Sequence, residues 1–142
     1  MSSPLPRCAV DANIILRYLL KDGGELAEKA RMIWDAVEAG RLLAVCDPVT
    51  LGEAVFVMSS VYHVPNEKIA GLLVSLLEPG SVLMVAKGRY LRALRLFAHS
   101  VSHFGDACAC ACALEECDGR LYSFDRKLSA VGGIERREEL GE

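Results

Sequence analysis

The chain has 142 residues, of which 52% are hydrophobic and 25% are charged, and its formal net charge is −3. This length is enough for one domain with its own core, so we expect a single domain over residues 1–142. No apolar run approaches the ~18 residues that a membrane span needs, and the first residues lack the pattern of a signal peptide. The small negative charge argues against a simple phosphate-binding surface, but it does not exclude a nucleic-acid substrate.

In the first half of the chain, short apolar runs alternate with segments of helical spacing. The pattern predicts a buried strand at 7–10, helices at 14–20 and 25–39, a strand at 42–46, and helices at 48–62 and 65–77. Asn13 is the expected cap of the first helix, and the segment 22–24 ends it. Asp47 followed by Pro48 is typical of a helix start.

The second half continues the alternation of strands and helices. It predicts a β-like run at 81–86, helices at 88–100 and 105–117, a turn at 118–119, a strand at 121–124 and a last short strand near Ile134. Strands that alternate with helices predict an α/β fold, here a three-layer α/β/α sandwich with a central, mostly parallel sheet.

Three carboxylates, Asp11, Glu53 and Asp106, each stand alone in a long uncharged stretch. A fourth, Asp125, closes the apolar and aromatic run at 121–124. An isolated carboxylate in apolar surroundings either loses its charge or finds a cation. If the fold brings the four together, a divalent metal site is the simplest explanation.

The expected positions of the four acids support this interpretation. Asp11 and Asp125 follow predicted strands, and ligands gather outside the carboxyl ends of parallel strands. Asp106 falls in the first turn of a predicted helix, where the helix dipole favours an anion. Glu53 lies in a helix that is apolar nearly all round, so we expect this helix to be buried.

Oxygen ligands select hard cations such as Mg²⁺ or Mn²⁺. Several carboxylates around such ions are suited to phosphodiester hydrolysis, in which one ion lowers the pKa of a water and another stabilises the leaving oxygen. Taken singly, each acid also has a structural explanation. Asp11 would be a helix cap, Asp106 a first-turn acid, and Glu53 the partner of a buried arginine.

Four segments, in this order and at this spacing, make the chain resemble the PIN-domain ribonucleases, and within them the VapC-type toxins of toxin–antitoxin modules. They are Val10-Asp11-Ala12-Asn13-Ile14-Ile15-Leu16-Arg17-Tyr18-Leu19, Val49-Thr50-Leu51-Gly52-Glu53-Ala54, His103-Phe104-Gly105-Asp106-Ala107 and Ser123-Phe124-Asp125-Arg126. The resemblance covers nearly the whole chain and implies a PIN-like fold. It departs from the pattern at His103, where many family members carry an aspartate.

The resemblance implies metal-dependent endonucleolytic cleavage of RNA. The six cysteines, without the spacing of a disulfide scaffold, predict a cytoplasmic protein. Asp11, Glu53, Asp106 and Asp125 would form the acidic, catalytic and Mg²⁺- or Mn²⁺-binding set, with Asp11 and Asp106 as the foremost direct ligands. Asn13 and Ser123 would be polar neighbours of these ligands and would hold the acids in position. Arg126 and His103 are candidate contacts to the RNA. The family also implies a homodimer and a small cognate antitoxin that blocks the site.

Two other functions compete with a nuclease. One is a catalytically degenerate PIN-like module that binds RNA or a protein without cutting, and the departure at His103 keeps it open. The other is an aspartate-based phosphotransfer domain, which ranks last because Asp11-Ala12-Asn13 lacks a second aspartate.

The cysteines carry a competing signal for a metal. Cys108, Cys110 and Cys112 alternate along one predicted helix, but no C-x-x-C pair completes a tetrahedral site. We therefore interpret them as small hydrophobic residues that let the helix pack closely. With no spacing typical of a disulfide scaffold, all six cysteines are expected to be reduced thiols.

Overall fold

The computed structural model describes residues 4–21 and 23–141. Its elements in chain order are β1 (Arg7–Ala9), α1 (Ala12–Leu20), α2 (Gly24–Glu38), β2 (Leu43–Val45), α3 (Pro48–Ser60), α4 (Asn66–Leu77), β3 (Val82–Leu83), α5 (Lys87–His99), α6 (Phe104–Glu116), β4 (Arg120–Tyr122), the 3-10 helix η1 (Arg126–Ala130) and β5 (Glu135–Arg137). The predicted break at 22–24 separates α1 from α2, and position 22 itself lies outside the described residues. Gly23 and Gly24 both adopt positive φ there, which glycine does without steric cost.

The strands are parallel throughout, and helices separate most of them along the chain, which confirms the predicted α/β class. They form two separate sheets in the described part of the chain. One has the order β1-β2-β3, with Cys8 opposite Ala44 and Ala44 opposite Val82. The other contains β4 and β5, with Leu121 opposite Arg136.

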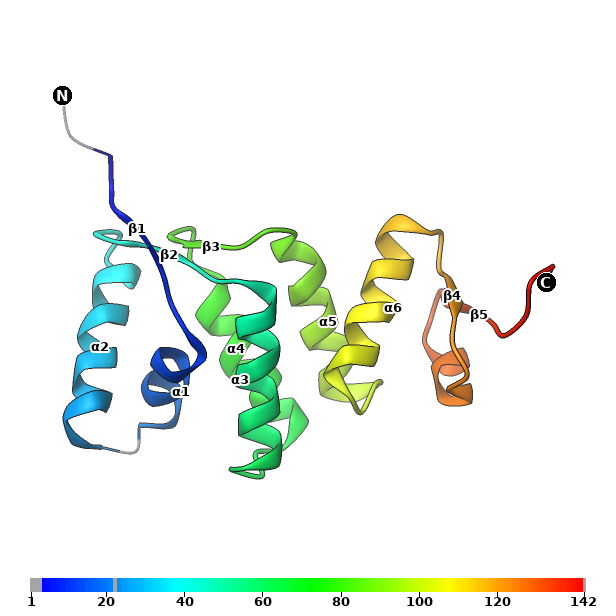
Figure 1. The fold of residues 1–142 in the computed structure, drawn as a ribbon, viewed down its shortest axis with the longest axis horizontal. Helices are drawn as coiled ribbons and strands as arrows, with labels where there is room; N and C mark the ends of the chain where they lie inside the picture. The colour runs from blue at the N-terminus through cyan, green and yellow to red at the C-terminus, as the bar shows by residue number, and fades with distance from the viewer. Residues whose placement is uncertain (1–3, 22, 142) are drawn as a thin grey trace.

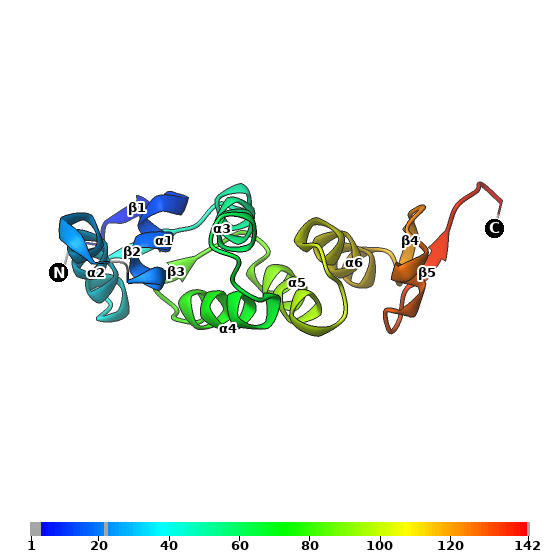
Figure 2. The same cartoon turned by 90° about the horizontal axis from the view of Figure 1, so that it is seen from below.

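The molecule is long rather than round (Figures 1 and 2). The three-stranded sheet lies toward one end together with α1 and α2. The helices α5 and α6 follow along the long axis, and β4 and β5 lie at the other end in both views. The strands β1 and β4 are therefore far apart within one chain.

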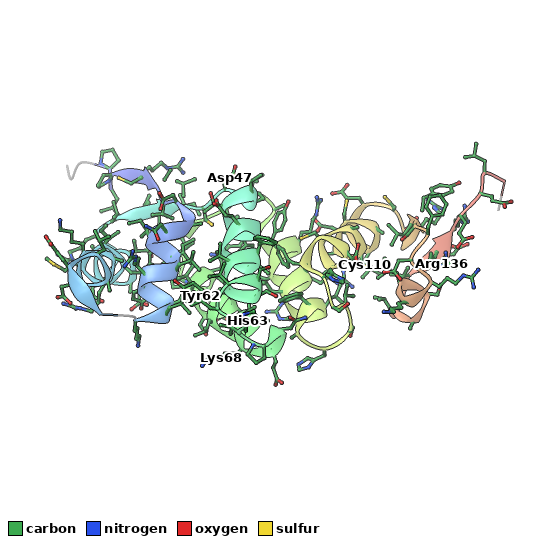
Figure 3. All side chains as sticks on the ribbon, turned by 60° about the horizontal axis from the view of Figure 1, so that its bottom comes forward. Asp47, Tyr62, His63, Lys68, Cys110 and Arg136 are labelled. Atoms are coloured by element: carbon green, nitrogen blue, oxygen red, sulfur yellow. The ribbon has the colours of Figure 1, made fainter. Side chains whose placement is uncertain are left out.

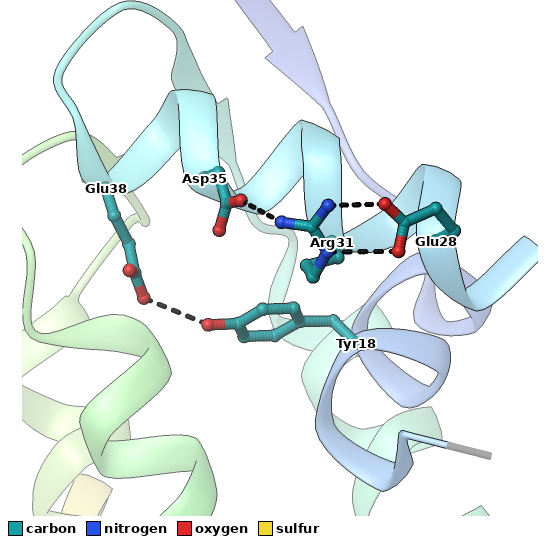
Figure 4. Close-up of polar contacts among 5 residues, drawn as sticks. All are labelled: Tyr18, Glu28, Arg31, Asp35 and Glu38. Atoms are coloured by element: carbon teal, nitrogen blue, oxygen red, sulfur yellow. Dashed lines mark hydrogen bonds and ion pairs between the residues drawn. The ribbon is translucent and has the colours of Figure 1, made fainter. Parts of the chain in front are cut away.

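The core is continuous from the first helices to α6 and is built from apolar side chains. At its N-terminal end the rings of Tyr18 and Trp34 pack with their centroids 5.8 Å apart, which fixes α1 against α2. The Tyr18 hydroxyl donates to Glu38 at 3.1 Å (Figure 4). Burial, followed by this hydrogen bond to Glu38, raises the pKa of Tyr18. None of the helices in the described ranges is long and apolar enough to cross a membrane.

Two elements are more exposed than their sequence predicts. All three residues of β1 are exposed, whereas a buried strand was expected. The helix α3 was expected to be buried all round, but Val49 is 78% and Phe56 64% exposed. Within the described ranges, no further strand pairs with the free edge of β1, and no element covers the face of α3 that carries Val49 and Phe56.

All six cysteines are free thiols, as expected. Cys110 is fully buried in the core, and the partly buried Cys108 packs against the core cluster. Burial raises the pKa of Cys108, and that of Cys46, to about 11. These observations support a packing role for Cys108 and Cys110, whereas Cys112 is half-buried.

The pKa shifts predict a marked difference in thiol reactivity. Burial disfavours the charged thiolate, so Cys46 and Cys108 stay protonated and unreactive until the pH rises toward about 11. Cys8 is exposed on β1 and is expected to react first near neutral pH. Alkylation followed by mass spectrometry of the peptides, at rising pH, measures the order. Equal labelling of all three near neutral pH would contradict the buried environment.

Candidate functional site

Asp11 lies two residues after β1 and caps α1. Its Oδ1 accepts a hydrogen bond from the backbone N–H of Ile14 at 3.0 Å. The predicted cap, Asn13, is instead the second residue of the helix, and its side chain is exposed. The predicted position of the cap was wrong by two residues, because aspartate and asparagine are both good caps and both precede the apolar run.

Glu53 lies on α3, which packs beside α1, and its side chain is exposed. It was expected to be buried and to need a partner, and this was wrong because its face of α3 is uncovered. Glu53 and Asn13 both line a hollow of about 280 Å³ between α1 and α3. The first two acids, Asp11 and Glu53, thus belong to the N-terminal part of the molecule.

Asp106 and Asp125 belong to the C-terminal part. Asp106 is in the first turn of α6, and its Oδ2 lies 3.9 Å from Nδ1 of His103. Burial, followed by the charges of Asp106 and Asp125, raises the pKa of the Cys110 thiol on the same helix. Figure 3 shows Cys110 on α6, away from Asp47 at the start of α3.

Asp125 is held in place by its own loop. Its Oδ1 accepts from the backbone N–H of Lys127 at 3.0 Å, which caps η1. The Ser123 hydroxyl accepts from the backbone N–H of Asp125 at 3.1 Å, and the role of Ser123 in positioning the acids stays a prediction. Arg126 follows directly and is exposed at the start of η1.

Arg136 also contacts the loop that carries Asp125, and the sequence did not predict this. Its guanidinium donates from Nη1 to the backbone oxygen of Ser123 at 2.8 Å and from Nε to the Ser129 hydroxyl at 2.7 Å. It therefore joins β5 to both sides of the Asp125 loop. Figure 3 marks the position of Arg136 toward the C-terminal end of the molecule. The sequence does show two consecutive arginines, Arg136 and Arg137, near the last predicted strand. Such a pair is equally expected on a solvent-exposed surface, so it does not by itself indicate a role at this loop.

One chain does not bring the four acids together. In the ranges that the structure describes, no group of three or more His, Cys, Asp or Glu side chains is placed to hold a metal ion. Asp11 and Glu53 instead belong to elements around the three-stranded sheet, whereas Asp106 and Asp125 belong to α6 and to the loop after β4, which is in the other sheet. Mg²⁺ needs about six closely placed oxygens, so either pair alone is a poor site for it. The roles of these residues as ligands stay predictions.

The sequence model of one family, described as the PIN domain, matches residues 8–134. This match spans most of the chain and includes all four acids, so the chain belongs to the PIN-domain family. The family has a nuclease-type fold, and its members typically use divalent metal ions. No curated protein and no solved structure matches the chain.

Proposed function

We propose that the protein is a metal-dependent endoribonuclease and the toxin of a toxin–antitoxin pair. The observation that carries this proposal is the family match over residues 8–134, which contains Asp11, Glu53, Asp106 and Asp125 in the expected order. RNA is the proposed substrate, Mg²⁺ or Mn²⁺ the proposed cofactor, and the cytoplasm the proposed compartment. A second copy of the chain and a small antitoxin are the proposed partners.

The local geometry supports the proposed roles of the acids. Asp11 and Asp125 each use one carboxylate oxygen to accept from a backbone N–H, which leaves the other oxygen available to a ligand. Asp106 has the favourable field of a helix N-terminus. Arg126, exposed beside Asp125, is suited to contact a backbone phosphate of the RNA.

A degenerate PIN-like module that binds RNA or a protein without cutting is the second candidate. The separation of the acids into two pairs within one chain favours it. A single experiment distinguishes the two functions, because only the nuclease turns over its RNA.

The nuclease activity is tested by incubating the purified protein with total cellular RNA in Mn²⁺ or Mg²⁺. We expect cleavage with either ion, no cleavage in excess chelator, and recovery when the ion is restored. Hydrolysis by water should leave a 5′-phosphate, which ligation-based mapping of the cut ends detects. RNA that is bound but stays intact at every metal concentration would contradict the nuclease and support the binding module.

A further inference from the structure

The strands β1 and β4 each have one free edge. In the part of the chain that the structure describes, β1 pairs only with β2 and β4 pairs only with β5. The residues of β1 are all exposed. A free strand edge presents unpaired N–H and C=O groups that another strand of suitable direction can pair with.

Joining these two edges in parallel would also unite the two pairs of acids. Asp11 follows β1 and Asp125 follows β4, and the carboxyl ends of parallel strands meet at the same edge of a sheet. Glu53 is near that end of β2, in the second turn of α3, and Asp106 lies in the first turn of α6, the helix that leads into β4. A pairing through the other edges, those of β3 and β5, would not place Asp11 beside Asp125.

The chain's own C-terminal part is held away from β1 by several contacts. Arg89 on α5 forms ion pairs with Glu115 at 3.0 Å and with Glu116 at 2.7 Å, both on α6. The rings of Phe97 and Phe104 pack edge to face across the same pair of helices, with centroids 5.8 Å apart. These contacts fix α6 along α5.

The corner between α5 and α6 is short and also held. Val101 in this corner is buried, and the backbone oxygen of Ser102 accepts from Nδ2 of Asn66 at 3.1 Å. The β4–β5 unit is joined closely to α6, since the N–H of Gly119 donates to the backbone oxygen of Ala113 at 2.8 Å. Bringing β4 to β1 of the same chain would move α6 off α5 and break the contacts of Arg89, Phe97 and Ser102, whereas a second chain can supply β4 without breaking them.

Apolar side chains are left uncovered on both parts that would meet. Phe124 beside Asp125 is 84% exposed, and Phe56 on α3 is 64% exposed. An open cleft of about 680 Å³ lies between α3 and α6, and its lining includes Val49, Phe56 and Phe104. Uncovered apolar groups around a free strand edge are typical of a surface that a protein partner covers.

We propose that two copies of the chain exchange their C-terminal units, which extend from α6 to β5. The strand β4 of each copy pairs in parallel with β1 of the other, and the two exchanges close the dimer symmetrically. Each dimer then contains two composite sites, with Asp11 and Glu53 from one copy and Asp106 and Asp125 from the other. This assignment of the site rests on the proposed nuclease function, but the exchange of strands does not.

The composite site is tested by complementation between inactive variants. Asp11→Asn and Asp106→Asn chains with different affinity tags are co-expressed, and mixed dimers are purified through both tags. An exchanged mixed dimer has one intact site and one doubly altered site, so we expect about half of the wild-type cleavage rate. Sites confined to single chains would give no recovery.

The reciprocal mixture is the matched control. A chain carrying both substitutions is paired with a wild-type chain, with the same tags. Exchange leaves no intact site in this mixed dimer and predicts loss of cleavage, whereas sites confined to single chains predict about half of the wild-type rate. Cleavage at about half of the wild-type rate by this mixed dimer, or failure to recover any mixed dimer, would overturn the proposal.

A cross-link tests the exchange without any need for activity. Leu121→Cys and Tyr122→Cys are each prepared with the native Cys8, because neighbouring residues of a strand point to opposite faces and one of them shares the face of Cys8. Mild oxidation is expected to give a disulfide-linked dimer in one variant, and Cys8→Ser should abolish it. A link within one chain, or no link in either variant, would overturn the exchange. If wild-type protein fails to cleave RNA, the nuclease proposal fails and this cross-link alone decides the exchange.

Discussion

Asp11→Asn is expected to lower RNA cleavage by about 10³-fold while leaving the free energy of unfolding within about 0.5 kcal/mol of wild type. Asparagine caps a helix as well as aspartate does, so its side-chain oxygen still accepts from the N–H of Ile14. The carboxylate charge, which the proposed site needs, is lost. Cleavage rates with Mn²⁺ and urea unfolding, measured on the same preparation, separate the two properties.

Two further variants show which role Asp11 has. Asp11→Ala removes both the cap and the charge, so we expect the same loss of cleavage and a loss of about 1 kcal/mol in stability. Asp118→Asn removes a charge from an exposed turn outside the predicted site and should change neither property. If Asp11→Asn cleaves RNA normally and only Asp11→Ala is affected, Asp11 is a helix cap and no more.

Most of the local structure could be predicted because its causes are local. Asp47 caps α3 through the N–H of Val49, and Pro48 takes the first position of that helix, as the dipeptide indicated. The observed bounds of the helices agree to within a few residues with the bounds predicted from the apolar spacing. The separation of strands by helices indicated parallel pairing, because parallel strands need such crossovers.

The arrangement of the sheets could not be predicted in the same way. In the structure β1 pairs with β2, and β4 pairs with β5 in a second sheet. No local pattern in Arg120–Tyr122 specifies which strand is its neighbour. The exposure of Glu53 follows from that arrangement and not from its apolar surroundings in sequence. The order of the four acids could be predicted from the sequence, whereas their division between the two ends of the chain could not.

Gly119→Ala is expected to destabilise the C-terminal unit by about 3 kcal/mol or more. Gly119 has a φ of +84°, and a Cβ added there would lie 1.9 Å from the backbone oxygen of Gly133. Alanine adopts this backbone conformation only at a cost of about 1–2 kcal/mol, and here the backbone must also move apart. The movement would weaken the bond from the N–H of Glu135 to the backbone oxygen of Gly119, now 2.8 Å long, at the start of the β4–β5 pairing.

Gly71→Ala is the matched control, because Gly71 lies exposed within α4 and an added Cβ would meet nothing within 4 Å. Alanine is the better helix former, so this variant should gain about 0.5–1 kcal/mol. Urea unfolding followed by circular dichroism compares the two variants with wild type. Because Asp125 lies three residues after the end of β4, Gly119→Ala should also abolish cleavage and the Cys8 cross-link, while Gly71→Ala keeps both. Equal stability of the two variants would show that the close approach of Gly119 to Gly133 does not hold the C-terminal unit together.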